Sequence, residues 1–352
     1  MTDGLIAPDE FIGMTGVAHL AAGGEAPVLR SHLQAFERFA ADKSAGMAGR
    51  DRMFETYHAT KEHVSWLVNR PVGDIALLSS ASEGINVVAQ SIDWRAGDNV
   101  VVSDFEFPSL IYPWLLLAGR GVTVRVVRTR DGRIDLDDLR GTVDDRTRVV
   151  AVSHVSYLTG QRVSLPAVAN VAWQSGAYLL VDATHALGAV PVDANHCDFL
   201  VSSCYKWLLA AHGLGIFVWN RSRVPTLVPA SVGWHSVVGG AGWKKHFEVT
   251  FRSDADRFEI ANPAFPSVYV LHNALNRLAD ITAREAEAHV LNLSGRVYRG
   301  LVDRGILPTT PPRPCDTFWS RRLGSRTTEI PMQSFLPSAL HVEDFLVGIV
   351  RA

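Results

Sequence analysis

The sequence predicts an α/β protein with a large, mostly parallel β-sheet, and three observations support this fold class. From about residue 74 to residue 220, short β-branched runs alternate with longer amphipathic runs, which is typical of parallel strands connected by helices. The 352-residue chain is 47% hydrophobic and can bury a substantial core. Its apolar runs are far shorter than the ~20 residues of a membrane span, so we expect a soluble protein with no membrane partner.

The expected elements follow in chain order. Two helices precede the sheet, over residues 28–43 and 51–69, and Arg70-Pro71 should end the second. Seven strands are expected at residues 74–79, 99–103, 122–127, 148–153, 177–182, 199–203 and 215–219. Helices between these strands are expected at residues 83–91, 109–118 and 165–175. A Gly- and Trp-rich loop (232–243) and one long helix (267–304) follow the sheet.

Three parts are expected along the chain. Residues 1–25 form an N-terminal segment, residues 26–265 form the large α/β domain, and residues 266–352 form the long helix and a small C-terminal domain. Few residues follow Gly305, where the long helix should end, so we expect an abbreviated small domain. The N-terminus carries the acidic Asp3 and no basic region with an apolar run, so no secretion signal is expected.

Charge and cysteine content argue against several functional classes. The 34 basic and 36 acidic residues give a net charge of -2 and form no long block of one sign, so nucleic acid is not an expected partner. Cys197, Cys204 and Cys315 show no CxxC spacing, and no HExxH motif occurs, so we expect neither a disulfide framework nor a metal site. A reducing, cytoplasmic location fits this cysteine usage.

Polar residues follow several of the expected strands, and in an open parallel sheet ligands bind at the carboxyl ends of the strands. The turn Ser80–Gly84 leads from a strand into a helix, so its backbone N–H groups would face an anion such as a phosphate. A simple helix cap is the alternative for this turn. The chain has no P-loop motif and no GxGxxG after a strand, which argues against ATP, GTP and NAD as ligands.

A carboxylate and a lysine are the most informative of these strand-end residues. Asp182 ends the apolar run 178–181, where a buried carboxylate needs a cation, and a protonated ring nitrogen of a cofactor would serve. Lys206 follows the next strand and precedes Trp207-Leu208-Leu209. In such an apolar setting a lysine has a depressed pKa and can form a Schiff base. A buried salt bridge and a surface lysine with a buried stem are the alternatives.

Taken together, the segments 180–188 (LVDATHALG), 202–208 (SSCYKWL) and 213–215 (GLG) resemble the class V aminotransferases. These are fold type I enzymes that use pyridoxal 5'-phosphate (PLP), and they include cysteine desulfurases, kynureninase and isopenicillin epimerase-like proteins. The resemblance covers about residues 15–305. It also includes the turn at Ser80, Glu106-Phe107-Pro108-Ser109, Pro113-Trp114, Val232-Gly233-Trp234 and Arg257-Phe258-Glu259.

The resemblance implies three catalytic residues and a stacking ring. Lys206 would be the Schiff-base lysine, and Asp182 would hold the pyridine nitrogen protonated so that the ring accepts electrons. His185 would lie near the ring hydroxyl of PLP. Phe107 lies where many relatives have a stacking histidine, so its ring would pack on the cofactor without supplying a proton, and an edge-packed core phenylalanine is the alternative.

The resemblance also implies the remaining cofactor contacts. Ala81, Ser82, Ser203 and Tyr205 match phosphate-binding positions. Tyr157 takes the place of an asparagine that some relatives hold beside the ring hydroxyl. Asn262 occupies the place where relatives offer a Gly-Thr pair to the phosphate of the partner subunit, which implies a homodimer with shared active sites.

The sequence departs from its relatives where they bind the substrate. Met332 stands where relatives usually carry an arginine for the α-carboxylate of the substrate. Cys315 could act as a desulfurase thiol, although its Pro-Cys-Asp context differs from the usual desulfurase loop, and a packed loop cysteine is the alternative. His212, His235 and His246 are expected near the mouth of the site, where each could contact substrate or serve only in packing.

The resemblance implies a PLP-dependent enzyme that acts on an amino acid or an amino-acid conjugate. We favour C–S bond cleavage (β-elimination) on a cysteine-type substrate, because Val232-Gly233-Trp234 and Asn262-Pro263 resemble the lyase and epimerase-like branches. An aminotransferase with a keto-acid partner is the alternative, followed by an epimerase or a decarboxylase. A protein that keeps the fold without catalysis is the interpretation from a different class.

Overall fold

The seven expected strands form a single sheet in the computed structural model, which describes residues 4–17, 19, 21–240, 242, 247–306 and 308. The strands are β1 (Ile75–Leu78), β2 (Asn99–Ser103), β3 (Thr123–Val127), β4 (Thr147–Ser153), β5 (Tyr178–Asp182), β6 (Phe199–Ser203) and β7 (Gly215–Trp219). Their order in the sheet is β1-β7-β6-β5-β4-β2-β3. Strands β2 to β6 are parallel, and β7 is antiparallel to both β1 and β6, so the prediction of a mostly parallel seven-stranded sheet is confirmed.

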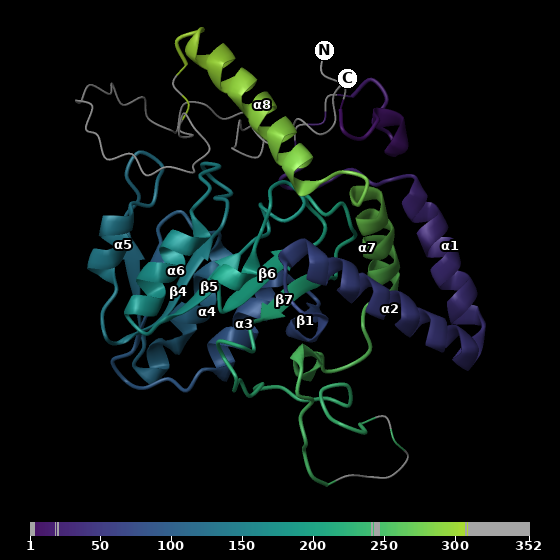
Figure 1. Cartoon of the computed structure of the whole chain (residues 1–352), viewed down its shortest axis with the longest axis horizontal. Helices are drawn as coiled ribbons and strands as arrows, with labels where there is room; N and C mark the ends of the chain where they lie inside the picture. Colours follow the sequence, from purple (N-terminus) through teal and green to yellow (C-terminus); the bar gives the residue numbers. More distant parts are fainter. Residues whose placement is uncertain are drawn as a thin grey trace.

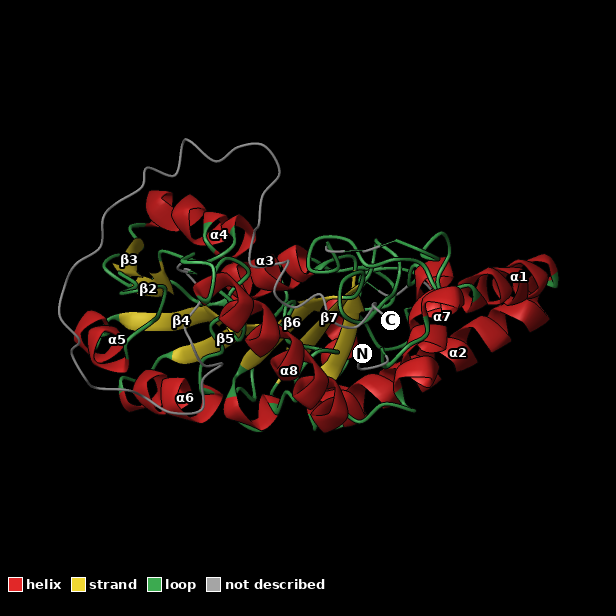
Figure 2. Cartoon of the chain, turned by 90° about the horizontal axis from the view of Figure 1, so that it is seen from above, coloured by secondary structure: helices red, strands yellow, loops and turns green. Residues whose placement is uncertain are grey.

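Helices cover both faces of the sheet, as Figure 2 shows. Helices α3 (Ala81–Ser91) and α4 (Tyr112–Leu115) lie on one face, and α5 (Leu136–Thr142) and α6 (Leu165–Gln174) lie on the other. Alternate residues of β5 belong to different cores: Leu180 packs on the α3 side, whereas Leu179 and Val181 pack on the α6 side. Because both faces of the central strands are buried, β5 and β7 are apolar over most of their length rather than alternating with polar residues, whereas the edge strand β3 is largely exposed.

Three further helices pack together beside β1 (Figure 1). They are α1 (Ser31–Ser44), α2 (Gly46–Val68) and α7 (Phe265–Leu278). Helix α2 ends at Asn69, whose φ of 55° is left-handed, and Pro71 follows two residues later, as expected for a helix stop. None of the described helices is long and apolar enough to cross a membrane.

Two expected helices differ from the structure. The single helix expected over 267–304 is wrong, because α7 ends at Leu278 and α8 (Ala283–Val302) starts separately. Thr282 and Glu285 form a capping box: the Thr282 hydroxyl accepts from the Glu285 N–H (3.2 Å) and the Glu285 carboxylate accepts from the Thr282 N–H (2.8 Å). This start signal gives α8 its own direction, away from α7 (Figure 1).

The helix expected over 109–118 is also wrong, since it is split into 3-10 turns at Pro108–Leu110 and Leu116–Arg120 on either side of the short α4, which carries Pro113 in its first turn. Helix α5 was not expected. The other 3-10 helices are Pro8–Glu10, Val72–Asp74, Ala194–His196 and Ala255–Phe258. No helix or strand lies in the described residues between β7 and Ala255, which agrees with the loop expected there.

A buried charged cluster, which we call the Lys61 cluster, joins α2 to β1. Lys61 contacts the carboxylate of Asp256 and lies 3.7 Å from that of Glu259, and Glu259 accepts hydrogen bonds from the Tyr57 hydroxyl and the Leu77 N–H, each at 2.8 Å. Burial raises the pKa of Glu259 to about 7 in spite of the opposing charge of Lys61. The ammonium group of Lys61 therefore compensates two carboxyl groups inside the protein.

Replacing Lys61 with methionine should lower the free energy of unfolding by about 3–5 kcal/mol, because the buried carboxyl groups of Asp256 and Glu259 lose their cation. Denaturant unfolding of both proteins measures this difference. Lys43→Met, at an exposed position of α1, is the matched control and should change stability by no more than about 0.5 kcal/mol. Equal losses in the two variants would contradict the compensation described here.

Candidate active site

Two turns at the carboxyl ends of β5 and β6 carry the expected carboxylate and lysine. Asp182 is the last residue of β5, and Lys206 follows the end of β6 by three residues. Gly188 has a φ of +96°, and a Cβ added to it would lie 2.4 Å from the Trp207 carbonyl oxygen. Glycine at position 188 therefore lets the turn after β5 pack directly against the Lys206 segment.

Lys206 and His185 form a buried pair. The Lys206 Nζ lies 3.0 Å from the His185 Nε2, and the two residues are only 7% exposed each. Burial, assisted by the charge of Lys206, lowers the pKa of His185 to about 3. His185 is thus neutral at ordinary pH, and its Nε2 can accept a hydrogen bond from the lysine.

The carboxyl group of Asp182 is buried, and its Oδ1 accepts a hydrogen bond from the Thr184 N–H at 2.9 Å. Burial raises the pKa of Asp182, against the hydrogen bonds from Thr184 and the positive charge of Lys206. A buried carboxylate in this environment is stabilised by a cationic partner such as a protonated ring nitrogen.

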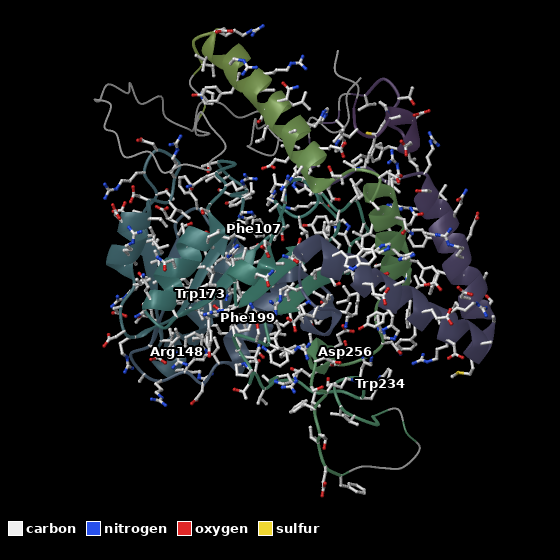
Figure 3. The ribbon with its side chains drawn as sticks, in the orientation of Figure 1. Phe107, Arg148, Trp173, Phe199, Trp234 and Asp256 are labelled. Carbon is white, nitrogen blue, oxygen red and sulfur yellow. The ribbon has the colours of Figure 1, made fainter. Side chains whose placement is uncertain are left out.

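Two aromatic rings lie near the lysine, and a third contacts one of them. The Lys206 Nζ lies 5.8 Å from the ring centroid of Phe107 and 5.9 Å from that of Tyr205. Tyr157 meets Phe107 edge-on at 5.3 Å and lies 6.5 Å from the His185 ring. Phe107 is 44% exposed, so the alternative of a core phenylalanine is wrong. Figure 3 shows Phe107 at the opposite end of the sheet from Arg148, which lies near the start of β4.

The start of α3 supplies groups suited to an anion. Helix α3 begins at Ala81 and is capped by Ser80, whose hydroxyl accepts from the Glu83 N–H at 3.1 Å. The Ser82 hydroxyl donates to the Ser109 hydroxyl at 2.9 Å. A Cβ on Gly215 would lie 2.3 Å from the Ser80 carbonyl carbon, so this glycine brings β7 close to the turn. Helix N–H groups and hydroxyls of this kind bind phosphate.

Ser203 and His212 also belong to this region. The Ser203 N–H donates to the Thr184 hydroxyl at 3.0 Å, which links the turns after β5 and β6. His212 stacks on the Tyr205 ring with centroids 4.2 Å apart, and its Nε2 lies 3.0 Å from a carboxylate oxygen of Glu25. The expectation that His212 lies near the mouth of the site agrees with these contacts.

Other expected residues lie elsewhere. His235 is buried 3.6 Å from the Glu259 carboxylate of the Lys61 cluster, so its expected place at the mouth is wrong. Asn262 is exposed and accepts a 2.7 Å hydrogen bond from Arg50, whose guanidinium lies over the Trp234 ring. Figure 3 shows Trp234 and Asp256 well apart from Phe107. His246, Cys315 and Met332 lie outside the described residues.

One residue of the site was not given a role by the sequence analysis. Glu106, directly before Phe107, is only 4% exposed and accepts hydrogen bonds from Ser103 and Ser153. Burial raises its pKa to about 7, and the charge of the nearby Asp182 acts in the same direction. In the sequence, the position of Glu106 after a predicted strand was the only indication that it belongs to the site. Its burial could not be predicted, because it depends on the order of the strands in the sheet.

A lysine, a buried carboxylate and an anion-binding helix start at one edge of such a sheet define a fold type I PLP-dependent protein. The Lys206 amine, the Asp182 carboxylate and the hydroxyls near α3 fit the aldehyde, the ring nitrogen and the phosphate of PLP. A model of the family described as "Aminotransferase class-V" matches residues 24–314. The chain belongs to this family, and its cofactor is pyridoxal 5'-phosphate.

Individual relatives are more distant. The chain is 26% identical over 242 residues to the "Uncharacterized aminotransferase YcbU" of Bacillus subtilis, covering 68% of this chain and 63% of that protein. It is 32% identical over 216 residues to a "Probable cysteine desulfurase" of Methanothermobacter thermautotrophicus, covering 60% of this chain and 54% of that protein. These matches span little more than half the length of these relatives.

The solved structure of the cystine C-S lyase C-DES has the same fold. It superposes with a TM-score of 0.77 at 22% sequence identity, covering 83% of this chain and 80% of that one. At this identity the similarity shows a shared fold and does not extend to the substrate of C-DES.

In the cofactor-free protein, His185 should show no titration step between pH 5 and pH 8 by NMR, because burial and Lys206 hold its pKa at about 3. The unfolded state binds this proton near pH 6.5 and the folded state does not. His185 therefore makes the free energy of unfolding fall as the pH drops from about 6.5 toward 3. The same protein in denaturant is the control and should titrate normally. A step near pH 6.5 in the folded protein would show that burial does not hold His185 in its neutral form.

Proposed function

We propose that this protein is a PLP-dependent enzyme that acts on an amino acid or amino-acid conjugate and favours C–S bond cleavage in a cysteine-type substrate. The observation that carries the proposal is the buried Lys206 amine, 3.0 Å from the neutral His185 and near the buried carboxyl group of Asp182. When bound, PLP supplies an electron-withdrawing ring next to the α-carbon of the substrate. The residues around this carbon would move its proton, which is the first step of the proposed reaction.

Three residues would carry the chemistry. Asp182 would keep a proton on the ring nitrogen, because a buried carboxylate favours a cation beside it. The Lys206 Nζ would take the proton from the substrate α-carbon as a general base. His185 would hold this amine in place through its Nε2, which accepts a hydrogen bond from the lysine when the proton of the neutral ring is on Nδ1.

The remaining residues would bind and orient the cofactor. Phe107 would pack on one face of the ring, with Tyr157 edge-on behind it. Phosphate would be held at the start of α3 and by hydroxyls of the strand-end turns. These phosphate-binding residues are Ala81, Ser82, Ser203 and Tyr205.

The favoured reaction balances without an added oxidant or reductant. The α-proton passes to the Lys206 Nζ, and the Cβ–S bond breaks with its electron pair going to sulfur. Protonated sulfur leaves as a thiol. The three-carbon remainder, an aminoacrylate, adds water and yields pyruvate and ammonia.

The thiols in the described part of the chain favour release of sulfur over its transfer to the enzyme. Cys197 and Cys204 are buried, and burial raises the pKa of both thiols far above the usual value. Neither can act as an exposed thiolate nucleophile. Cys315, outside the described residues, is the alternative acceptor that a desulfurase reaction would require.

Transamination with a keto-acid partner is the second candidate. The family description and the YcbU relative both name aminotransferases, and the same α-proton transfer by Lys206 begins that reaction. The two reactions differ only in the fate of the substrate after the proton leaves. Products distinguish them, because transamination leaves the Cβ–S bond intact and the keto acid keeps the sulfur, whereas β-elimination releases the sulfur separately from pyruvate.

The purified protein should show the visible absorbance of lysine-bound PLP, and Lys206→Ala should lose it. The wild type should release pyruvate and ammonia in equal amounts, together with an equal amount of hydrogen sulfide from L-cysteine or of thiol from a cysteine S-conjugate. Lys206→Ala should reduce this rate by at least about 10²-fold, the contribution of a positioned general base. Absorbance and product assays on the same samples measure both effects.

Lys43→Ala, at an exposed lysine, is the matched control and should leave spectrum and rate unchanged. If the cofactor is converted to its amine form and no sulfur product is released, the result would favour transamination over lyase activity. A wild-type spectrum with no turnover of any amino acid would favour a non-catalytic protein of this fold. No absorbance after incubation with PLP would reject the assignment of Lys206.

We also propose that the protein works as a homodimer in a cytoplasmic, reducing environment. Asn262 is hydrogen-bonded to Arg50, whose guanidinium lies over the Trp234 ring, and Figure 3 shows Trp234 away from Phe107, as expected of residues that would serve the phosphate site of a second subunit. The free thiols of Cys197 and Cys204 fit a reducing compartment. Light scattering at micromolar concentration should give the mass of two chains, and a monomeric mass with full PLP binding would contradict shared sites.

A further inference from the structure

Glu106 is a buried carboxyl group to which the chemistry above gives no task. Its carboxyl group accepts three hydrogen bonds. One oxygen accepts from the Ser103 hydroxyl at 2.8 Å, and the other accepts from the Ser153 N–H at 3.0 Å and the Ser153 hydroxyl at 2.5 Å. These hydrogen bonds fasten the turn after β2 to the carboxyl ends of two strands.

The partners of Glu106 belong to the frame that holds Asp182. Ser103 ends β2 and Ser153 ends β4, and Ser153 lies in register with Asp182 on β5. The next residue, His154, donates its N–H to the Asp182 carbonyl oxygen at 2.8 Å. Glu106 is therefore tied to the strand ends beside Asp182 on one side and is bonded directly to Phe107 on the other.

Burying this carboxyl is unfavourable by itself. The pKa of Glu106 is raised to about 7, chiefly by burial and also by the charge of Asp182, while the hydrogen bonds from Ser153 and Ser103 oppose the shift. The ionisable groups on the surrounding strand ends are Asp182 and His185 after β5, His154 after β4 and Lys206 after β6, with Asp104 in the same turn. An isolated core position would favour an apolar residue, so the carboxyl group has a positional role.

We propose that Glu106 is a positioning residue that sets Phe107 against the bound cofactor by anchoring its turn to the strand ends beside Asp182. This inference rests on the proposed function, because it assumes that PLP lies between Asp182 and the Phe107 ring. Phe107 itself is 44% exposed and has no dense packing to fix it. The hydrogen bonds of Glu106 would hold the position of Phe107 in place of such packing.

The test is a double-mutant cycle with PLP binding as its readout. Glu106→Ala should weaken PLP affinity about tenfold, the scale for ordering a side chain or two at a binding site, and reduce the visible circular dichroism of the bound cofactor. Glu106→Gln keeps the size and an acceptor oxygen, so it should stay within about threefold of wild type. In a Phe107→Ala background, Glu106→Ala should change the affinity by less than about twofold.

Asp104→Asn, which removes a carboxylate charge from the same turn, is the control and should leave the circular dichroism unchanged. If Glu106→Ala does not fold, Ser103→Ala removes one of the three hydrogen bonds and should show a smaller effect that also vanishes without Phe107. Equal effects of Glu106→Ala with and without Phe107, or no effect at all, would overturn the positioning role. Absence of PLP binding by the wild type would instead reject the proposed function.

Discussion

A negative charge at the buried end of β5 is the constraint around which the candidate site is organised. Asp182 receives hydrogen bonds from Thr184 and an electrostatic contribution from Lys206. Lys206 is its positively charged neighbour, whereas His185 is neutral and burial favours the protonated form of Glu106. The site thus keeps one carboxylate available for a cationic ring, which is the condition that PLP chemistry needs.

The Lys61 cluster shows the opposite solution to the same problem. There Lys61 contacts Asp256 directly and lies near Glu259, so the buried charges compensate each other within the protein. Figure 3 places Asp256 away from Phe107, so the two clusters occupy different parts of the molecule. A buried charge that the protein neutralises itself ties elements together, whereas one at a strand end of the sheet can bind a ligand.

The sheet makes the site possible because parallel strands end at one edge. Asp182, Ser153 and Ser103 meet there although β2, β4 and β5 are far apart in sequence. Two glycines allow the turns to approach one another: Gly188 beneath the Lys206 segment and Gly215 beside the start of α3. Helices on both faces exclude water from the strands, which strengthens each electrostatic interaction at the edge.

The sequence by itself determined the seven strands, helices α3 and α6 on opposite faces of the sheet, and the pair Asp182 and Lys206, because hydrophobic periodicity and strand-end position are local properties. It also contained the capping signal at Thr282 that separates α7 from α8, although the continuous helical pattern outweighed it. Only the tertiary structure decided three features: Lys206 contacts His185, Glu106 is buried, and His235 lies in the Lys61 cluster. The physical reason is that burial and charge–charge distance depend on which strands become neighbours, and strand order joins residues that no local pattern connects.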